Sequence, residues 1–428
     1  MPRIHDEEID RRILAVAERE ITTKGLTGMR VADVADQAGT TVAMVYRRFA
    51  DRDGLVAATL TSYFRARFQM VIDLAHAVLD RPGTLTVDDL VDAVPPMRYE
   101  GSEVLRHRMQ RIYVAAVENT ALRLAVREVI AAKLPEFASV IDAIAERFPP
   151  GRRFDPRIFT IYALRHNAIV DDILGDDGLS NDDYRDFLRT LLVDSMESGE
   201  TGGSDRTRSS TPTIPLTDAH VPRNLLLTDD DGTDPVDVRI LTATQEEIDD
   251  RGLVGMRVAS IAERAGTTVA MIYRRFTDRN GLIAACLGSN LDARLAEIAQ
   301  MPFAVIDRDG PITIDDILDG VPPLHFDGSD IIHARRQRIY IAALEIPELR
   351  TMVREVVSRR LPEFENAVRM MIDRLPEAER FDERILTVLL LRYNFMLDDV
   401  LGPHGQTNVE FRLFLRDLMV RSAQRRHR

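Results

Sequence analysis

Residues Ala38–Phe49 read AGTTVAMVYRRF, and residues Ala265–Phe276 read AGTTVAMIYRRF. The two segments differ at one position, where Val45 of the first corresponds to Ile272 of the second. Each contains a glycine suited to a sharp turn, a threonine pair suited to a helix start, and a short run that ends in Tyr-Arg-Arg-Phe. This is the pattern of the second helix of a helix-turn-helix. The sequence therefore predicts two DNA-reading units in one polypeptide.

The repeat extends far beyond this segment, at a constant offset of 227 residues (265 minus 38). Matching segments recur in the same register: Gln110–Tyr113 with Gln337–Tyr340, Leu134–Phe137 with Leu361–Phe364, and Arg153–Asp155 with Arg380–Asp382. A repeat of roughly 195 residues is much longer than the repeat of a solenoid. The matches therefore indicate the duplication of a complete folding module.

Each module shows helical spacing of apolar residues throughout. The first amphipathic helix is expected to stop before Gly25, and its second copy before Gly252. Short helices are expected over 30–37 and 41–48, followed by a longer helix that begins at Asp51, a suitable N-cap. No stretch alternates apolar and polar residues for long enough to indicate a sheet. The predicted fold class is all-α.

The repeat also predicts the domain order. Residues 1–50 and 234–277 are the expected helix-turn-helix DNA-binding domains, and residues 51–197 and 278–428 are larger helical domains. Residues 198–233 are the expected linker. Its start, within Glu197–Thr213, reads ESGETGGSDRTRSSTPT, a composition typical of flexible linkers. Residues 1–197 are called the first module below, and residues 234–428 the second module.

The composition, with 45% hydrophobic and 29% charged residues, is that of a soluble globular protein. No run of about 18 apolar residues indicates a transmembrane helix, and the charged N-terminus lacks the apolar core of a signal peptide. The one cysteine, Cys286, lies in an apolar run, which favours packing over reactivity. These features predict a cytoplasmic location without a membrane partner.

The net charge of −13 is unfavourable for contact with phosphates, so any DNA contact must be local. The segment Gly28–Leu55 holds four Arg and four Asp, whereas Gly255–Leu282 holds five Arg against Glu263 and Asp278, a net charge of +3. The acidity therefore lies mainly outside the two helix-turn-helix segments.

An enzyme finds little support in the sequence. No phosphate-binding glycine loop, metal-ligand spacing or Ser/His/Asp order is present, and the nine histidines form no cluster. Asp171 and Asp172 are adjacent, and adjacent helical residues point in different directions. The sequence predicts no catalytic residue, no cofactor and no metal.

Each module resembles a TetR-family transcriptional regulator. In the first module the resemblance rests on Gly25-Leu26, Val31–Ala35, Ala38-Gly39, Tyr46–Phe49 and Asp51–Leu55. The second carries Gly252-Leu253, Val258–Ala262, Ala265-Gly266, Tyr273–Phe276 and Asp278–Leu282. The resemblance covers nearly the whole chain, twice. It implies a three-helix DNA-binding domain followed by a larger helical domain, and a function in transcription, most often repression.

The resemblance also implies which side chains contact DNA. The threonines cap the recognition helix, the Tyr and Arg residues donate to the DNA backbone, and Arg52 and Arg279 replace a lysine of the family. For the arginine pairs, a solvated helix end is the alternative. The candidates are Arg30, Thr40, Thr41, Val42, Ala43, Met44, Tyr46, Arg47, Arg48 and Arg52, with Arg257, Thr267, Thr268, Val269, Ala270, Met271, Tyr273, Arg274, Arg275 and Arg279.

Three features depart from the family pattern. Arg30 and Arg257 stand where a Ser or Thr usually caps the second helix, and a threonine replaces the apolar residue after the turn glycine. The expected base-facing residues, Val42–Met44 and Val269–Met271, have no hydrogen-bonding side chains. They can contact thymine methyl groups, so the sequence predicts thymines in the operator together with readout of DNA shape.

TetR-like proteins form dimers through their last two helices. The corresponding segments are Arg157–Leu174 with Asn181–Met196, and Arg384–Leu401 with Asn408–Arg421. Because both modules lie in one chain, a monomeric pseudo-dimer is expected to read a near-palindromic double-stranded operator. A homodimer of chains with four reading heads is the alternative. A DNA-organising protein without an effector is a further alternative.

The resemblance implies an unknown small-molecule effector bound in the helical domain. The candidate lining residues are His107, Arg111, Tyr113, Arg165, His166 and Asn167 in the first module, and Arg338, Tyr340, Arg392, Tyr393 and Asn394 in the second. Arg392 and Asp399 are seven residues apart on one helix face, so an ion pair between them is an alternative to a ligand site. The basic end, Arg425–Arg428, is expected to be a frayed terminus or a further phosphate contact.

Overall fold

The computed structural model describes residues 2–95, 112, 115–116, 119–164, 166, 169–196, 234–321, 335–336, 338–343, 346–393 and 405–427. The chain divides into two compact units. Unit 1 comprises Met1–Leu85, Asp89–Ile144 and Asn394–Gly405, and unit 2 comprises Thr86–Asp88, Ala145–Tyr393 and Gln406–Arg428. The predicted linker, residues 198–233, lies outside the described residues, and the predicted domain boundaries stay predictions.

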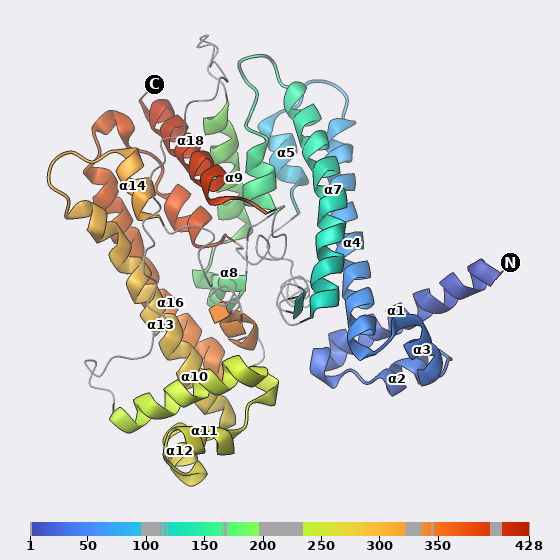
Figure 1. Ribbon diagram of the computed structural model, residues 1–428. Coiled ribbons are helices and arrows are strands. Elements are labelled where there is room, and N and C mark those ends of the chain that lie inside the picture. Colours follow the sequence, from blue (N-terminus) through green and yellow to red (C-terminus); the bar gives the residue numbers. More distant parts are fainter. Residues whose placement is uncertain are drawn as a thin grey trace. The chain divides into compact units, whose positions relative to one another are not determined.

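Unit 1 contains the first helix-turn-helix and the long helices that follow it in the chain (Figure 1). Its helices are α1 (Pro2–Gly28), α2 (Val31–Gln37), α3 (Val42–Phe49), α4 (Arg52–Leu79), most of α5 (Val87–Ala93) and nearly all of α7 (Thr120–Glu146). Ile13, Val34, Val45 and Leu55 are each 0% exposed and form the core that joins the first four helices. Phe68 of α4 meets Phe137 of α7 edge to face, with ring centroids 6.5 Å apart.

Unit 2 contains the second module together with the end of the first. Its elements are η1 (Ile158–Ala163), α8 (Ile169–Leu174), η2 (Gly175–Asp177), α9 (Asn181–Ser195), α10 (Pro235–Gly255), α11 (Val258–Arg264), α12 (Val269–Phe276), α13 (Arg279–Ile306), α14 (Ile314–Gly320), α16 (Pro347–Asp373), η4 (Glu377–Glu379), η5 (Ile385–Leu390) and α18 (Asn408–Arg426). No strand occurs among the described residues, which confirms the all-α prediction.

The predicted starts of the helices are confirmed. Asp51 caps α4 by accepting a hydrogen bond from the Gly54 N–H at 2.7 Å, and Asp278 caps α13 in the same way at 2.8 Å. The expected breaks after the first helix also occur. Gly25 and Gly252 have φ values of 74° and 70°, so each bends the chain within α1 and α10.

The end of the first module packs into the second module. Ile173 and Leu174 of α8 are buried in one apolar cluster with Leu349 and Val353 of α16. Arg354 of α16 donates to the Leu174 carbonyl. Helix α18 lies along α9 (Figure 1). The helices expected to pair two proteins therefore pair two parts of one chain.

The last helices differ from their predicted form. The segment Arg157–Leu174 is not one helix, because a π-helical turn, η1, ends at Ala163 and α8 begins at Ile169. Between them His166 forms an isolated antiparallel bridge with Tyr393. These residues are equivalent in the repeat (166 plus 227 is 393), so the bridge joins the same position of the two copies.

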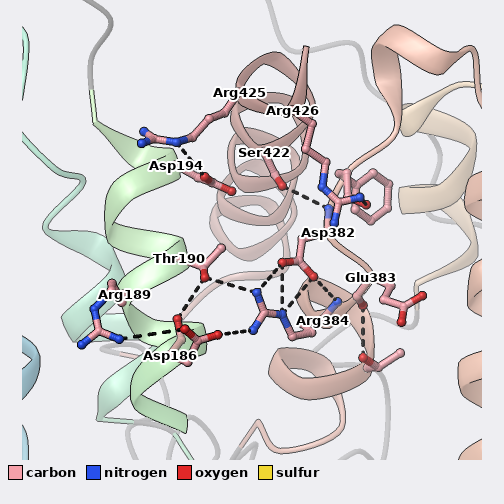
Figure 2. A network of polar contacts seen from close by, with 12 residues as sticks. Asp186, Arg189, Thr190, Asp194, Asp382, Glu383, Arg384, Ser422, Arg425 and Arg426 are labelled. Carbon is pink, nitrogen blue, oxygen red and sulfur yellow. Dashed lines mark hydrogen bonds and ion pairs between the residues drawn. The ribbon is translucent and has the colours of Figure 1, made fainter. Parts of the chain in front are cut away.

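A turn built around an aspartate is also repeated in both copies. The Asp155 N–H donates to the Ser195 hydroxyl at 3.0 Å, and the Asp382 N–H donates to the Ser422 hydroxyl at 3.0 Å (Figure 2). Each aspartate also pairs with the arginine two residues later, at 2.6 Å in the first module and 2.8 Å in the second. The same turn is thus built twice, once in each module.

The turn after each recognition helix is tight in both modules. Ala50 and Thr277 have φ values of 66°, and the N–H of the next residue donates to the carbonyl of Phe49 or Phe276 at 2.8 Å or 2.7 Å. A Cβ atom on Gly54 would lie 2.0 Å from the Phe49 oxygen, and one on Gly281 would lie 2.1 Å from the Phe276 oxygen. Only glycine fits at these two positions.

We predict that Gly281→Ala lowers the thermal stability of the protein. In an unconstrained helix a Gly→Ala change stabilises by about 0.5–1 kcal/mol, whereas here the methyl group meets backbone and should cost about 1–3 kcal/mol. Asn280→Ala, one residue earlier at an exposed position, is the control and should have little effect. Unfolding followed by circular dichroism would contradict the prediction if Gly281→Ala raised the midpoint.

Candidate nucleic-acid interface

The recognition helices begin where the sequence predicts. The Thr41 hydroxyl accepts the Met44 N–H at 3.2 Å, and the Thr268 hydroxyl accepts the Met271 N–H at 3.2 Å. The preceding turns are also the same, with Gly39 and Gly266 at φ values of 64° and 62°. A threonine cap and a left-handed glycine therefore define the start and the direction of α3 and α12.

The outer faces of α3 and α12 carry the predicted contact residues. Val45 and Ile272 are 0% exposed and attach each helix to its core. Tyr46 and Tyr273 are 42% and 39% exposed, a large exposure for aromatic residues. Five further residues of each helix and its cap are exposed or half-buried: Thr41, Val42, Ala43, Met44 and Arg47 in the first module, and Thr268, Val269, Ala270, Met271 and Arg274 in the second. Thr40 and Thr267 are half-buried in the turn.

The two arginines of each helix have different surroundings. Arg47 contacts the Met44 sulfur at 2.9 Å, Arg274 contacts the Met271 sulfur at 2.9 Å, and neither pairs with a carboxylate of the described residues. Their cationic ends are available to phosphates.

By contrast, Arg48 and Arg275 are held by acidic residues of the first helix of their own module. Arg48 pairs with Asp10 at 3.1 Å, and Arg275 pairs with Asp237, the equivalent residue, at 2.6 Å and with Asp234 at 2.8 Å. Hydrogen bonds with Asp234 and then Asp237 raise the pKa of Arg275. The second arginine of each pair therefore anchors the recognition helix, a role that the motif alone does not distinguish from DNA contact.

The remaining predicted arginines lie near helix starts. Arg30 and Arg257 are exposed and make no side-chain cap, as their departure from the family pattern implies. Arg52 pairs with Asp53 at 3.5 Å. Arg279 donates to the Leu253 carbonyl, next to the bend at Gly252, so it supports the backbone of α10.

A buried carboxylate beneath each helix-turn-helix was not identified from the sequence. Glu20 is 5% exposed and accepts from Gln37 of α2 at 2.8 Å. The equivalent Glu247 is 0% exposed and accepts from the Ser260 hydroxyl at 2.7 Å. Burial acts to raise the pKa of Glu247, but hydrogen bonds from Ser260 and the Arg257 N–H outweigh it and lower that pKa. The sequence feature that could have indicated this carboxylate is the glutamate at the same position of both modules, Glu20 and Glu247.

The candidate effector residues are only partly described. His107, Arg111, Tyr113, Arg165, Asn167 and Asn394 lie outside the described residues. Arg338 lies 3.9 Å from Asp249, and Tyr340 is buried in the core of unit 2. Tyr393 is 2% exposed. Of the described candidates, His166 and Tyr340 lie within electrostatic reach of Arg392 and Asp171, and His166 bridges Tyr393, whereas Arg338 lies beside Asp249.

Arg392 has a partner that differs from the predicted one. It forms a double hydrogen bond with Asp171 of the first module, at 2.7 Å and 3.0 Å, and the two side chains are 7% and 0% exposed. Asp399, the expected partner, lies outside the described residues. The charge of Arg392 is therefore balanced by a carboxylate of the other module.

His166 lies in an aromatic cluster of the first module. Its ring is 4.6 Å from that of Tyr184 and 5.5 Å from that of Tyr162. Both ring nitrogens are shielded from solvent and hydrogen-bond to no described group, as is the Tyr162 hydroxyl. Burial lowers the pKa of His166 from 6.5 to about 3. The equivalent residues of the second module are Leu389, Tyr393 and Phe411, so this polar cluster is present in the first module only.

We predict that His166 makes the protein less stable in acid. Unfolded His166 binds a proton as the pH falls through 6.5, whereas folded His166 stays neutral until about pH 3. The free energy of unfolding should therefore fall between pH 6.5 and 3, by about 1.4 kcal/mol per pH unit. His166→Phe should remove this part of the pH dependence. Equal loss of thermal midpoint in both proteins between pH 7 and pH 5 would contradict the prediction.

The described residues hold no group of three or more His, Cys, Asp or Glu that could bind a metal ion. Cys286 is buried, as predicted, and burial raises the pKa of its thiol to about 12. None of the described helices is both long enough and apolar enough to span a bilayer.

Comparison with known proteins gives one family. The family model described as bacterial regulatory proteins, tetR family, matches residues 13–59 and again residues 240–286. The chain is similar to a solved putative TetR-family transcriptional regulator from Mesorhizobium loti MAFF303099, with 18% identity over 44% of this chain and 92% of that chain and a TM-score of 0.32. It is also similar to a putative TetR-family transcriptional regulator from Rhodococcus sp., with 24% identity over 45% of this chain and 100% of that chain and a TM-score of 0.28. No curated protein matches.

Proposed function

Because the chain is a tandem TetR-like protein, we propose that it is a transcriptional regulator, a repressor that holds one operator with both heads of a single chain. The observation that carries this proposal is the matched pair of exposed helices, α3 and α12. Residues 40–44 are the same as residues 267–271, and each set follows the same cap and turn. Two equal reading surfaces favour two half-sites of equal sequence, that is, a near-palindromic operator.

The chemistry of these surfaces supports different DNA contacts for different residues, with apolar side chains on the bases and donors on the phosphates. Ala43 and Met44, like Ala270 and Met271, offer only apolar contacts, which suit thymine methyl groups. The exposed Tyr46 hydroxyl and Arg47 guanidinium, with their counterparts in α12, are donors for phosphate oxygens. Affinity then comes from the backbone contacts, and sequence preference comes from methyl contacts and DNA shape.

The pairing of α9 with α18 supports the single-chain part of the proposal. In a helix-turn-helix dimer, contacts between subunits set the spacing of the heads. Here the corresponding helices already pair within one chain, and the second binding event becomes intramolecular.

Release by a small-molecule effector is also part of the proposal. A buried group without a hydrogen-bond partner costs about 1–3 kcal/mol, and a polar ligand that reached Tyr162 or His166 would recover that energy. Such a ligand would act by favouring one arrangement of the modules over another.

Selection of bound duplexes from a random pool tests the proposed readout. We predict two half-sites of the same sequence, related by a two-fold axis, with thymines where the helices meet the major groove. Selected sites without thymines would contradict the assigned reading face. Binding spread evenly over unrelated sequences would favour a DNA-organising protein instead.

A double variant tests the free arginines. Arg47→Ala with Arg274→Ala should weaken binding to all sequences and reduce the slope of log affinity against log salt by about 1.8, because roughly 0.9 is expected per lost phosphate contact. Arg153→Ala removes an exposed arginine outside both matched domains and is the control. An unchanged salt slope in the double variant would exclude these two arginines as phosphate contacts.

A further inference from the structure

Helix α9 pairs with α18 of the same chain, although it could instead pair with α9 of another chain. The two helices are equivalent in the repeat, so Asp194 of α9 corresponds to Arg421 of α18 (194 plus 227 is 421), and Ser195 corresponds to Ser422. By shape alone, two chains could pair α9 with α9 and α18 with α18. Something must favour the pairing of unlike helices for one chain to form its own pseudo-dimer.

Two arginines of α18 bind the C-terminal end of α9. Arg421 donates to the Ser195 carbonyl at 2.7 Å, and Arg425 donates to the Val193 carbonyl at 2.6 Å. Arg425 also pairs with Asp194 at 3.5 Å (Figure 2). The last carbonyls of a helix lack partners within the helix and carry partial negative charge, so cations bind them favourably. Arg426 donates to the Phe381 carbonyl at 3.3 Å, so Arg425 and Arg426 both hold carbonyls of other segments and are not frayed.

The same contacts fail when like helices pair. If α9 met α9 of another chain, Asp194 would take the place of Arg421 and face the partner's carbonyls, where a negative charge is repelled. If α18 met α18, Arg425 would face an arginine in the place of Asp194. In an α9–α9 pair a carboxylate would therefore face partly negative carbonyls, and in an α18–α18 pair an arginine would face an arginine. The α9–α18 pair instead brings opposite charges together.

The other arginine contacts hold the modules together without selecting the partner. Arg157 reaches Asp417 at 2.6 Å, and Arg384 reaches Asp186 at 2.9 Å (Figure 2). The equivalent of Asp186 is Leu413, and the equivalent of Asp417 is Thr190. Arg384 contacts both of these positions in α9, Asp186 and the Thr190 hydroxyl, and one of the two positions is acidic in either module. These pairs would thus survive in like pairings.

We propose that the charge difference between Asp194 and the pair Arg421 and Arg425 is a selection device, which makes the first module choose a second module over another first module. The inference rests on the proposed single-chain assembly and names what enforces it. The partner of α9 is α18 of the same chain, whose two guanidinium groups bind the C-terminal end of α9.

Charge reversal in the full-length chain tests the proposal. Asp194→Arg should repel Arg425 and at the same time allow α9 to cap α9 of another chain, so the particle mass should shift from one chain, 48.3 kDa, to two chains. Adding Arg425→Asp restores an opposite pair and should return the mass to one chain. Asp182→Arg makes the same change at an exposed site of α9 and should leave one chain. Sedimentation velocity measures all four proteins.

The outcomes separate this proposal from the proposed function. If the unchanged protein sediments as one chain and Asp194→Arg also does, the selection device is wrong, while the single-chain assembly stands. If Arg425→Asp does not rescue Asp194→Arg, opposite charges at positions 194 and 425 do not select the partner, and the proposal is wrong. If the unchanged protein sediments as two chains, both the selection device and the single-chain assembly are wrong. DNA selection with the same samples reports separately on operator reading.

Discussion

Asp171 of the first module and Arg392 of the second form an ion pair that neither module can complete alone. Both side chains are buried, and the guanidinium binds the carboxylate through two hydrogen bonds. Taking two charges out of water is expensive, and removing one partner of such a pair typically costs about 3–5 kcal/mol because the other charge stays buried. The pair therefore penalises any arrangement in which the end of the first module leaves the second. It lies close to the bridge between His166 and Tyr393, which are equivalent residues of the two copies.

The parts of the fold that depend on local sequence could be predicted. The Thr41 and Asp51 caps, the bends at Gly25 and Gly252 and the burial of Cys286 each follow from one residue and its neighbours. What could not be predicted depends on contacts between distant residues. The motif alone does not distinguish Arg47 from Arg48. The fold does, because it brings Asp10 of α1 against Arg48, whereas Arg47 contacts the Met44 sulfur. Likewise, the contact between Arg392 and Asp171 joins residues 221 positions apart, so spacing within one helix could not indicate it.

The two modules have diverged in some places and not in others, and the difference is informative. The reading helices are the same over residues 40–44 and 267–271, down to the cap distance of 3.2 Å. The aromatic cluster around His166 is polar in the first module and largely apolar in the second. The exposed faces of α3 and α12 are therefore the same in the two copies, whereas the aromatic cluster and the α9–α18 contact differ between them.

The central claim is that one chain does the work of two subunits on DNA. The most direct measurement is the mass of the complex between the protein and its selected operator, by native mass spectrometry at protein excess. The account predicts one chain per duplex, with both half-sites protected from cleavage. Two chains per duplex, or protection of one half-site by a single chain, would contradict it.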